Sequence, residues 1–307
     1  MSILDLLFSP PTGLTLAEIL ALAAILGLLH GITPDEHTWP ITFSYAIGSY
    51  STRGGMRSGF VFSAGFTSQR AILTTLGYLG LAGLLLADHL DGLIYVVVGA
   101  VMFVAGSYIL NGRYLHLPLD RLLGGRAHHS VRAERRPGDE DRPRAVSLRM
   151  ALVHGFIAGW GIGGYAAILV FVLAPRVGSV LLAPLVGVAF GLGTMAMQVM
   201  MGGVFANLIR RGRMTPDQVR YIGQKTAGRT LYFGGAAFVA IGAVLALFPA
   251  LQSAGVATGS IIPNLDFIGV AFVLIVVVVG VIGGWSLAKA YRESRRFAVT
   301  AAPDPPA

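Results

Sequence analysis

The sequence predicts an all-α polytopic membrane protein with about seven transmembrane helices, arranged as an inverted repeat of three plus three with an extra C-terminal helix. Composition, apolar run length and charge placement predict this class. Of the 307 residues, 54% are hydrophobic and 12% are charged, whereas soluble domains are about 25% charged. The mean hydropathy is +0.70, which implies more apolar surface than the core of a soluble protein of this size can bury. Cysteine is absent, which excludes disulfides and thiolate metal sites.

Seven apolar runs are long enough to cross the membrane, which takes about 20 helical residues. The first run begins at a capping-box pattern, Thr15 with Glu18. Residues 38–52 are too polar for a full span but carry no charge, so they are predicted as a re-entrant or surface segment. The seven runs cover residues 14–31, 57–87, 92–111, 148–174, 178–209, 229–250 and 264–288.

Basic residues alternate between the connections. Those on one side of the predicted membrane carry 21 of the 23 Lys and Arg residues, those on the other side carry one, and Arg70 lies inside a span. Cytoplasmic loops are enriched in Lys and Arg, so we expect a multi-pass protein of the cell (plasma or inner) membrane, with its N-terminus outside and its C-terminus cytoplasmic. The formal net charge of +8 is therefore attributed to topology, and no nucleic-acid partner is expected.

A charged stretch divides the chain. Residues 1–112 form the predicted first transmembrane half, 113–147 a cytoplasmic linker, 148–251 the second half, and 252–307 the final helix and tail. Both halves begin with a span that contains His-Gly, at His30 and at His154. Because three spans precede the linker, these two spans run in opposite directions, as in many secondary transporters. Both histidines are predicted at similar depths, which suggests one shared site.

Residues 30–40 read His-Gly-Ile-Thr-Pro-Asp-Glu-His-Thr-Trp-Pro and concentrate ionisable groups next to a helix break. The break is predicted at Gly31 and Pro34, because proline removes a backbone donor and disrupts the preceding turn. Ionisable groups at membrane depth usually line a polar cavity, and imidazole with carboxylate suits divalent transition metals. The candidate metal ligands are His30, Asp35, His37 and His154; a turn that merely caps the next helix is the structural alternative.

These residues resemble a motif of the nickel/cobalt transporter family, which includes related urease-accessory membrane proteins. That family carries His, four residues, Asp, His in its first membrane helix; here His30 and Asp35 keep the first interval, and His37 follows after Glu36. A second family motif is similar to residues 62–68, Phe-Ser-Ala-Gly-Phe-Thr-Ser, with Phe66 at the position of a histidine. The resemblance implies that His30, Asp35 and His37 bind the transported ion.

The leading functional hypothesis is therefore a secondary transporter of a divalent metal ion, nickel or cobalt, with no permanently bound cofactor and no enzymatic activity. No P-loop is present, so we expect an ion or proton gradient to drive it, with Glu36 as the coupling group. Arg70 is either a counter-ion to the carboxylates or the anion-binding group of an exporter of organic or sulfur-containing anions. A third hypothesis is an intramembrane metal-dependent hydrolase with Glu36 as general base. The expected partners are the metal ion and membrane lipid, and a homo-oligomer is left open.

Overall fold

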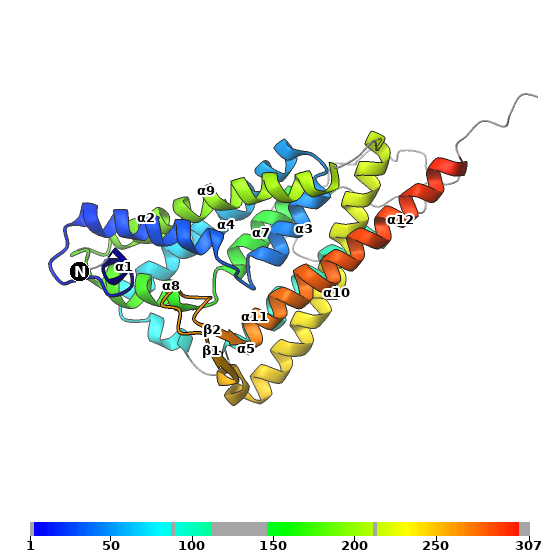
Figure 1. Cartoon of the computed structure of the whole chain (residues 1–307). Coiled ribbons are helices and arrows are strands. Elements are labelled where there is room, and N and C mark those ends of the chain that lie inside the picture. The colour runs from blue at the N-terminus through cyan, green and yellow to red at the C-terminus, as the bar shows by residue number, and fades with distance from the viewer. Residues whose placement is uncertain (1–2, 87–89, 112–145, 211–213, 301–307) are drawn as a thin grey trace, which may run out of the picture.

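The computed structural model describes residues 3–86, 90–111, 146–210 and 214–300 (Figure 1). This part of the chain is mostly helical, as expected from the sequence. The predicted linker falls almost entirely outside it. Within the described residues, four helices are long and apolar enough to cross a membrane, which fits a membrane protein: Leu90–Leu110, Ala183–Asn207, Pro216–Leu247 and Val270–Arg295.

The elements before the predicted linker are six helices. Their order is α1 (Ile3–Phe8), α2 (Leu16–Ile32), α3 (Trp39–Gly48), α4 (Thr52–Tyr78), the 3-10 helix η1 (Ala82–Leu86) and α5 (Leu90–Asn111). The predicted capping box is present at the start of α2, where the Thr15 backbone and hydroxyl both donate to Glu18. Residues 38–52, which were predicted as a re-entrant or surface segment, contain helix α3. Its residues Pro40–Gly48 are all buried.

The elements after the predicted linker begin with an interrupted helix. They are α7 (Leu148–Ala158), α8 (Gly164–Ala167), the π-helix η3 (Ile168–Leu173), η4 (Ala174–Arg176), α9 (Ala183–Asn207), η5 (Leu208–Arg210) and α10 (Pro216–Leu247). A short connection follows, with η6 (Pro249–Ser253) and the antiparallel strands β1 (Gly255–Ala257) and β2 (Phe267–Gly269). The chain then continues through α11 (Val270–Ile275), the π-helix η7 (Val276–Gly283) and α12 (Gly284–Thr300).

The predicted span over 148–174 is helical in the structure except for an interruption at residues 159–163. This interruption contains Gly159, Gly161 and Gly163, and glycine is the poorest helix former after proline. The structure thus contains two broken helices, α2 with α3 and α7 with α8.

Glycines set the distance between the helices that carry the two breaks. A Cβ added to Gly27 in α2 would overlap the backbone oxygen of Phe190 in α9, and one added to Gly155 in α7 would overlap that of Phe62 in α4. The two pairs are related by a shift of 128 positions: Gly27 and Gly155 are 128 residues apart, and so are Phe62 and Phe190. The pairs Gly59 with Gln198 and Gly187 with Arg70 obey the same shift, as do Gly31 with Met197 and Gly159 with Gln69. Helix pairs α2–α9 and α7–α4 therefore cross in the same way.

This shift changes the pairing of the histidines that the sequence suggested. At 128 positions, His30 corresponds to Ala158, and His154 corresponds to Leu26. The His-Gly similarity is therefore displaced by four residues, about one helical turn, from the correspondence that the packing follows.

Helices α5 and α10 approach each other through a second set of glycines. Backbone atoms of α10 lie against Gly92, Gly99 and Gly106, and backbone or side-chain atoms of α5 lie against Gly228, Gly235 and Gly242. In each helix the glycines recur every seven residues, which keeps them on one face. Small residues of this kind let helix backbones approach closely within a membrane.

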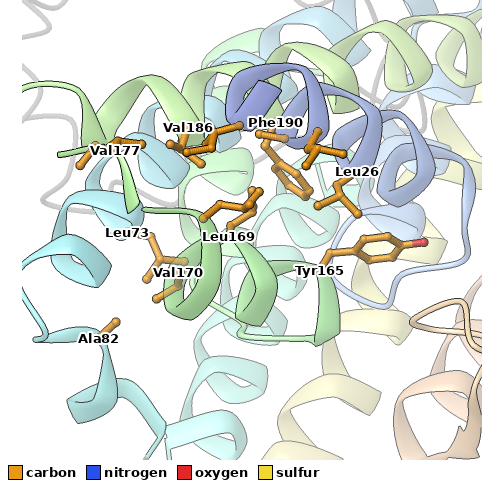
Figure 2. Close-up of a cluster of buried hydrophobic side chains, with 14 of the residues drawn as sticks. Leu26, Leu73, Ala82, Tyr165, Leu169, Val170, Val177, Val186 and Phe190 are labelled. Carbon is orange, nitrogen blue, oxygen red and sulfur yellow. The ribbon is translucent and has the colours of Figure 1, made fainter. Parts of the chain in front are cut away.

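A cluster of buried apolar side chains fills the space between α2, α4, η3 and α9 (Figure 2). Leu26, Leu169 and Phe190 contribute to it, and Tyr165 lies at its edge with its hydroxyl oxygen directed away from the other side chains. The cluster holds α8 in place next to the end of α2, so Tyr165 forms part of the wall of the cavity described next.

Candidate functional site

The first helix break is stabilised by hydrogen bonds within the segment itself. Helix α2 ends at Ile32, and the Thr33 hydroxyl donates to the carbonyl oxygen of Leu29 at 2.9 Å. One Asp35 carboxylate oxygen, Oδ1, accepts from the backbone N–H groups of His37 at 3.1 Å and Thr38 at 2.8 Å. An Asp side chain that accepts from the backbone N–H two residues further on forms an Asx turn, so Asp35 holds the turn of residues 35–38 that leads into α3.

A buried cavity lies where the two helix breaks face each other. Its volume is about 30 Å³ for the centres of water-sized molecules, whereas roughly 10–15 Å³ suffices for one water. It therefore has room for a small ion or a few waters. The lining residues come from both breaks, from α4 and from the connection before α11: His30, Asp35, Glu36, His37, Phe66, Arg70, Ala158, Gly161, Gly163, Tyr165, Ala166 and Asn264.

Two imidazoles and two carboxylates share this cavity as neighbouring pairs. Asp35 Oδ2 lies 3.9 Å from Nδ1 of His30, and Oε1 of Glu36 lies 3.4 Å from Nε2 of His37. Oε1 of Glu36 also accepts a hydrogen bond from the Tyr95 hydroxyl at 3.0 Å. Oδ2 of Asp35 does not accept from the turn before α3, so Asp35 has one structural contact through Oδ1 and one contact with His30 through Oδ2.

His30 is surrounded by aromatic rings instead of hydrogen-bond partners. Its ring lies 5.5 Å from that of Phe66, 5.5 Å from that of Tyr165 and 5.3 Å from that of Phe190, measured between centroids. Neither ring nitrogen has a hydrogen-bond partner within the described residues. A buried polar group of this kind is rare unless it binds a water, an ion or a ligand.

Arg70 reaches the same cavity from α4 and is 3% exposed. Its guanidinium carbon lies 4.6 Å from the centroid of the Phe66 ring, and Nη1 and Nη2 are each 3.4 Å from the carbonyl oxygen of Gly161. Among the described residues no carboxylate lies within 4.0 Å of its nitrogens, and Nε has no hydrogen-bond partner. Arg70 therefore brings a positive charge that is only weakly compensated at contact distance.

The second break supplies space instead of charge. A Cβ added to Gly161 would lie 2.7 Å from both Cδ2 and Nε2 of His37, so the His37 ring needs glycine at this position. Pro263 lies against Gly164, and the Asn264 side chain lies near Gly163. The connection between α10 and α11 thus closes the remaining side of the cavity.

The structure does not bring His154 to this site. His154 is fully buried, and its Nδ1 lies 2.7 Å from the hydroxyl of Tyr45 in α3. It is not among the residues that line the cavity. The structure therefore does not place His154 at the cavity that His30 lines, and pairs it with Tyr45 instead. His30, Asp35, Glu36, His37 and Arg70 do come together, next to Gly31 and Pro34 at the break.

Several contributors to the cavity were not predicted as site residues from the sequence, among them Tyr95, Gly161, Tyr165 and Asn264. Gly161 stands in a glycine-rich stretch of residues 159–164, but nothing in the sequence connected it with His37. Tyr95 and Asn264 lie far along the chain from the break and carry no local signal.

The cavity is not a preformed metal centre. Within the described residues, no group of three or more His, Asp or Glu side chains is arranged to hold a metal ion. Binding of an ion by His30, Asp35 and His37 would therefore require their side chains to rotate toward one another.

Comparisons with protein-family models, with curated proteins and with solved structures gave no match. The functional interpretation therefore rests on the chemistry of the cavity.

Proposed function

We propose that the protein is a membrane secondary transporter of a divalent transition-metal ion, nickel or cobalt. The observation that carries this proposal is the gathering of His30, Asp35, Glu36 and His37 in one buried cavity at the meeting point of two broken helices. Secondary transporters bind substrate at broken helices near the membrane centre, and intramembrane ionisable groups mark ion pathways. Imidazole and carboxylate are ligands suited to nickel and cobalt.

The proposed architecture is a seven-span inverted repeat with the N-terminus outside and the C-terminus in the cytoplasm. The glycine contacts that recur at a shift of 128 residues support the repeat, and the distribution of basic residues supports the orientation. Interrupted helices α2–α3 and α7–α8 then enter the membrane from opposite sides. Only the first carries ligands, since Ala158 stands at the position equivalent to His30.

Each cavity residue has a proposed role. His30, Asp35 and His37 bind the ion, and Glu36, which is held by the Tyr95 hydroxyl, carries the coupled proton. Arg70 balances the two carboxylates when the ion is absent and weakens ion binding when it is present, which favours release. His154 is assigned to helix packing because of its bond to Tyr45.

Metal uptake into proteoliposomes loaded with a metal-sensitive dye tests this proposal. We expect nickel or cobalt entry with the parent protein and a loss of at least tenfold with His30→Ala or His37→Ala. The matched control is Asp217→Asn, which removes an exposed carboxylate at the start of α10 and should transport like the parent. Equal uptake by protein-free vesicles and by the parent would refute the proposal.

Anion export is a second candidate, favoured by one observation: Arg70 lines the cavity and has no carboxylate within 4.0 Å among the described residues. Efflux of a labelled sulfonate or organic carboxylate from the same vesicles separates the two functions. If anions are the substrate, Arg70→Gln abolishes their efflux and metal flux is absent throughout. If metal is the substrate, the parent shows no anion efflux.

A further inference from the structure

A groove lies at the polar end of the last helix, far from the cavity between the helix breaks. It has a volume of about 330 Å³ and is lined by Trp285, Lys289, Arg292 and Glu293 of α12. Positions 285, 289 and 292 are four and three residues apart and therefore share one face of the helix. Trp285, Lys289 and Arg292 are exposed, whereas Ser286, Ala290 and Ser294 are buried.

The groove is positively charged because Glu293, the one carboxylate among its described lining residues, is already paired. Both carboxylate oxygens of Glu293 accept from Nη2 of Arg229 in α10, at 2.8 and 2.9 Å, and the Tyr221 hydroxyl donates to it at 3.2 Å. Nζ of Lys289 lies 4.9 Å above the centroid of the Trp285 ring. In the described part of the chain no carboxylate lies within 4.0 Å of Lys289 or Arg292, so both cations are available to an anion.

The helix leading to the groove is apolar and uncovered. Val273, Val277 and Val281 are exposed, with Val281 at 61%, and they precede Trp285 at intervals of four residues. Trp285 is 46% exposed and stands at the change from an apolar to a basic helix, the position typical of tryptophan at a membrane interface. A free phosphate would contact only the cations, whereas a phospholipid would also cover the valines.

We propose that this groove binds the headgroup of an anionic phospholipid. The phosphate lies between Lys289 and Arg292, and one acyl chain runs along Val281, Val277 and Val273. A zwitterionic lipid is disfavoured because its own cation would meet Lys289 and Arg292 while Glu293 is occupied by Arg229. This inference does not depend on what the cavity between the helix breaks transports.

Native mass spectrometry of the full chain, released from detergent with added phosphatidylglycerol or phosphatidylcholine, tests the proposal. We expect one retained phosphatidylglycerol and about 30-fold weaker retention in the double variant Lys289→Gln, Arg292→Gln, from about 1 kcal/mol for each basic residue near an anionic lipid. The matched control is Arg53→Gln with Arg57→Gln, which removes two exposed charges from α4. It should retain the lipid like the parent.

The other outcomes overturn the proposal. Equal loss of phosphatidylglycerol from both double variants would mean that net charge, not this groove, holds the lipid. Equal retention of phosphatidylcholine, or displacement of the lipid by millimolar inorganic phosphate, would mean that the groove recognises no anionic lipid. Val281→Asn provides an independent measurement, because it leaves both cations in place and should still weaken phosphatidylglycerol retention.

Discussion

The hydrogen bond between Tyr45 and His154 provides a quantitative test of the structural role assigned to this histidine. Tyr45→Phe removes the hydroxyl that lies 2.7 Å from Nδ1 of His154. The two side chains are 1% and 0% exposed, so water does not replace the lost partner. An unsatisfied buried group costs about 1–3 kcal/mol in soluble proteins, and side-chain hydrogen bonds in membranes measure about 0.6 kcal/mol on average and about 1.7 kcal/mol at most. We expect a loss of about 1.5 kcal/mol, roughly a tenfold change in the unfolding equilibrium.

Equilibrium unfolding of the purified protein in mixed micelles with increasing sodium dodecyl sulfate measures this loss. A double-mutant cycle with His154→Leu isolates the pair, and we expect a coupling of about 1 kcal/mol. Metal uptake by Tyr45→Phe should equal that of the parent after correction for the folded fraction. An uncoupled cycle, or uptake that falls as far as in His30→Ala, would refute the structural assignment and return His154 to the transport site.

Three further predictions concern the two helix breaks and one glycine crossing. Gly161→Ala should abolish metal uptake without unfolding the protein, because its Cβ would displace the ring of His37; uptake and the unfolding midpoint are compared in the same preparation. Asp35→Asn retains an oxygen that can accept from the backbone N–H groups of His37 and Thr38 but removes the charge, so it should fold and fail to transport, whereas Asp35→Ala should also lose about 1 kcal/mol of stability because these groups lose their acceptor. Gly155→Ala should destabilise the protein by about 1–3 kcal/mol through overpacking against the Phe62 backbone. Gly280→Ala, which has open space around it, should not, and similar unfolding midpoints for the two variants would contradict the helix crossing.

The sequence was sufficient to predict the helical membrane class and most helix positions, because those depend on local composition. Span 92–111 agrees with α5 at Leu90–Asn111, and the predicted capping box at Thr15 is present. The first helix break was also predictable, because proline, glycine and charged residues coincide between Gly31 and His37. Charged side chains cannot sit in a lipid-facing helix without a polar cavity.

Longer-range relations were not predictable from one chain. The His-Gly similarity suggested that His30 and His154 are equivalent, but helix packing follows glycines and backbone contacts, and these place the correspondence four residues away. The bond between Tyr45 and His154 joins residues 109 positions apart, a contact that no local pattern encodes. The seven-residue spacing of Gly92, Gly99 and Gly106, repeated at 228–242, was the signal that could have revealed the close pair α5–α10.

The cavity is lined both by packed helices and by the connection of residues 249–269, and these two kinds of segment differ in how easily their residues can be substituted. Glycine crossings fix the helices so tightly that nearly any larger residue there collides with a backbone atom. Asn264 instead reaches the cavity from a surface connection, and such connections tolerate substitution and insertion far better than packed helices. The lining of the cavity can therefore change by exchange of a single short segment, while the helix crossings stay constant.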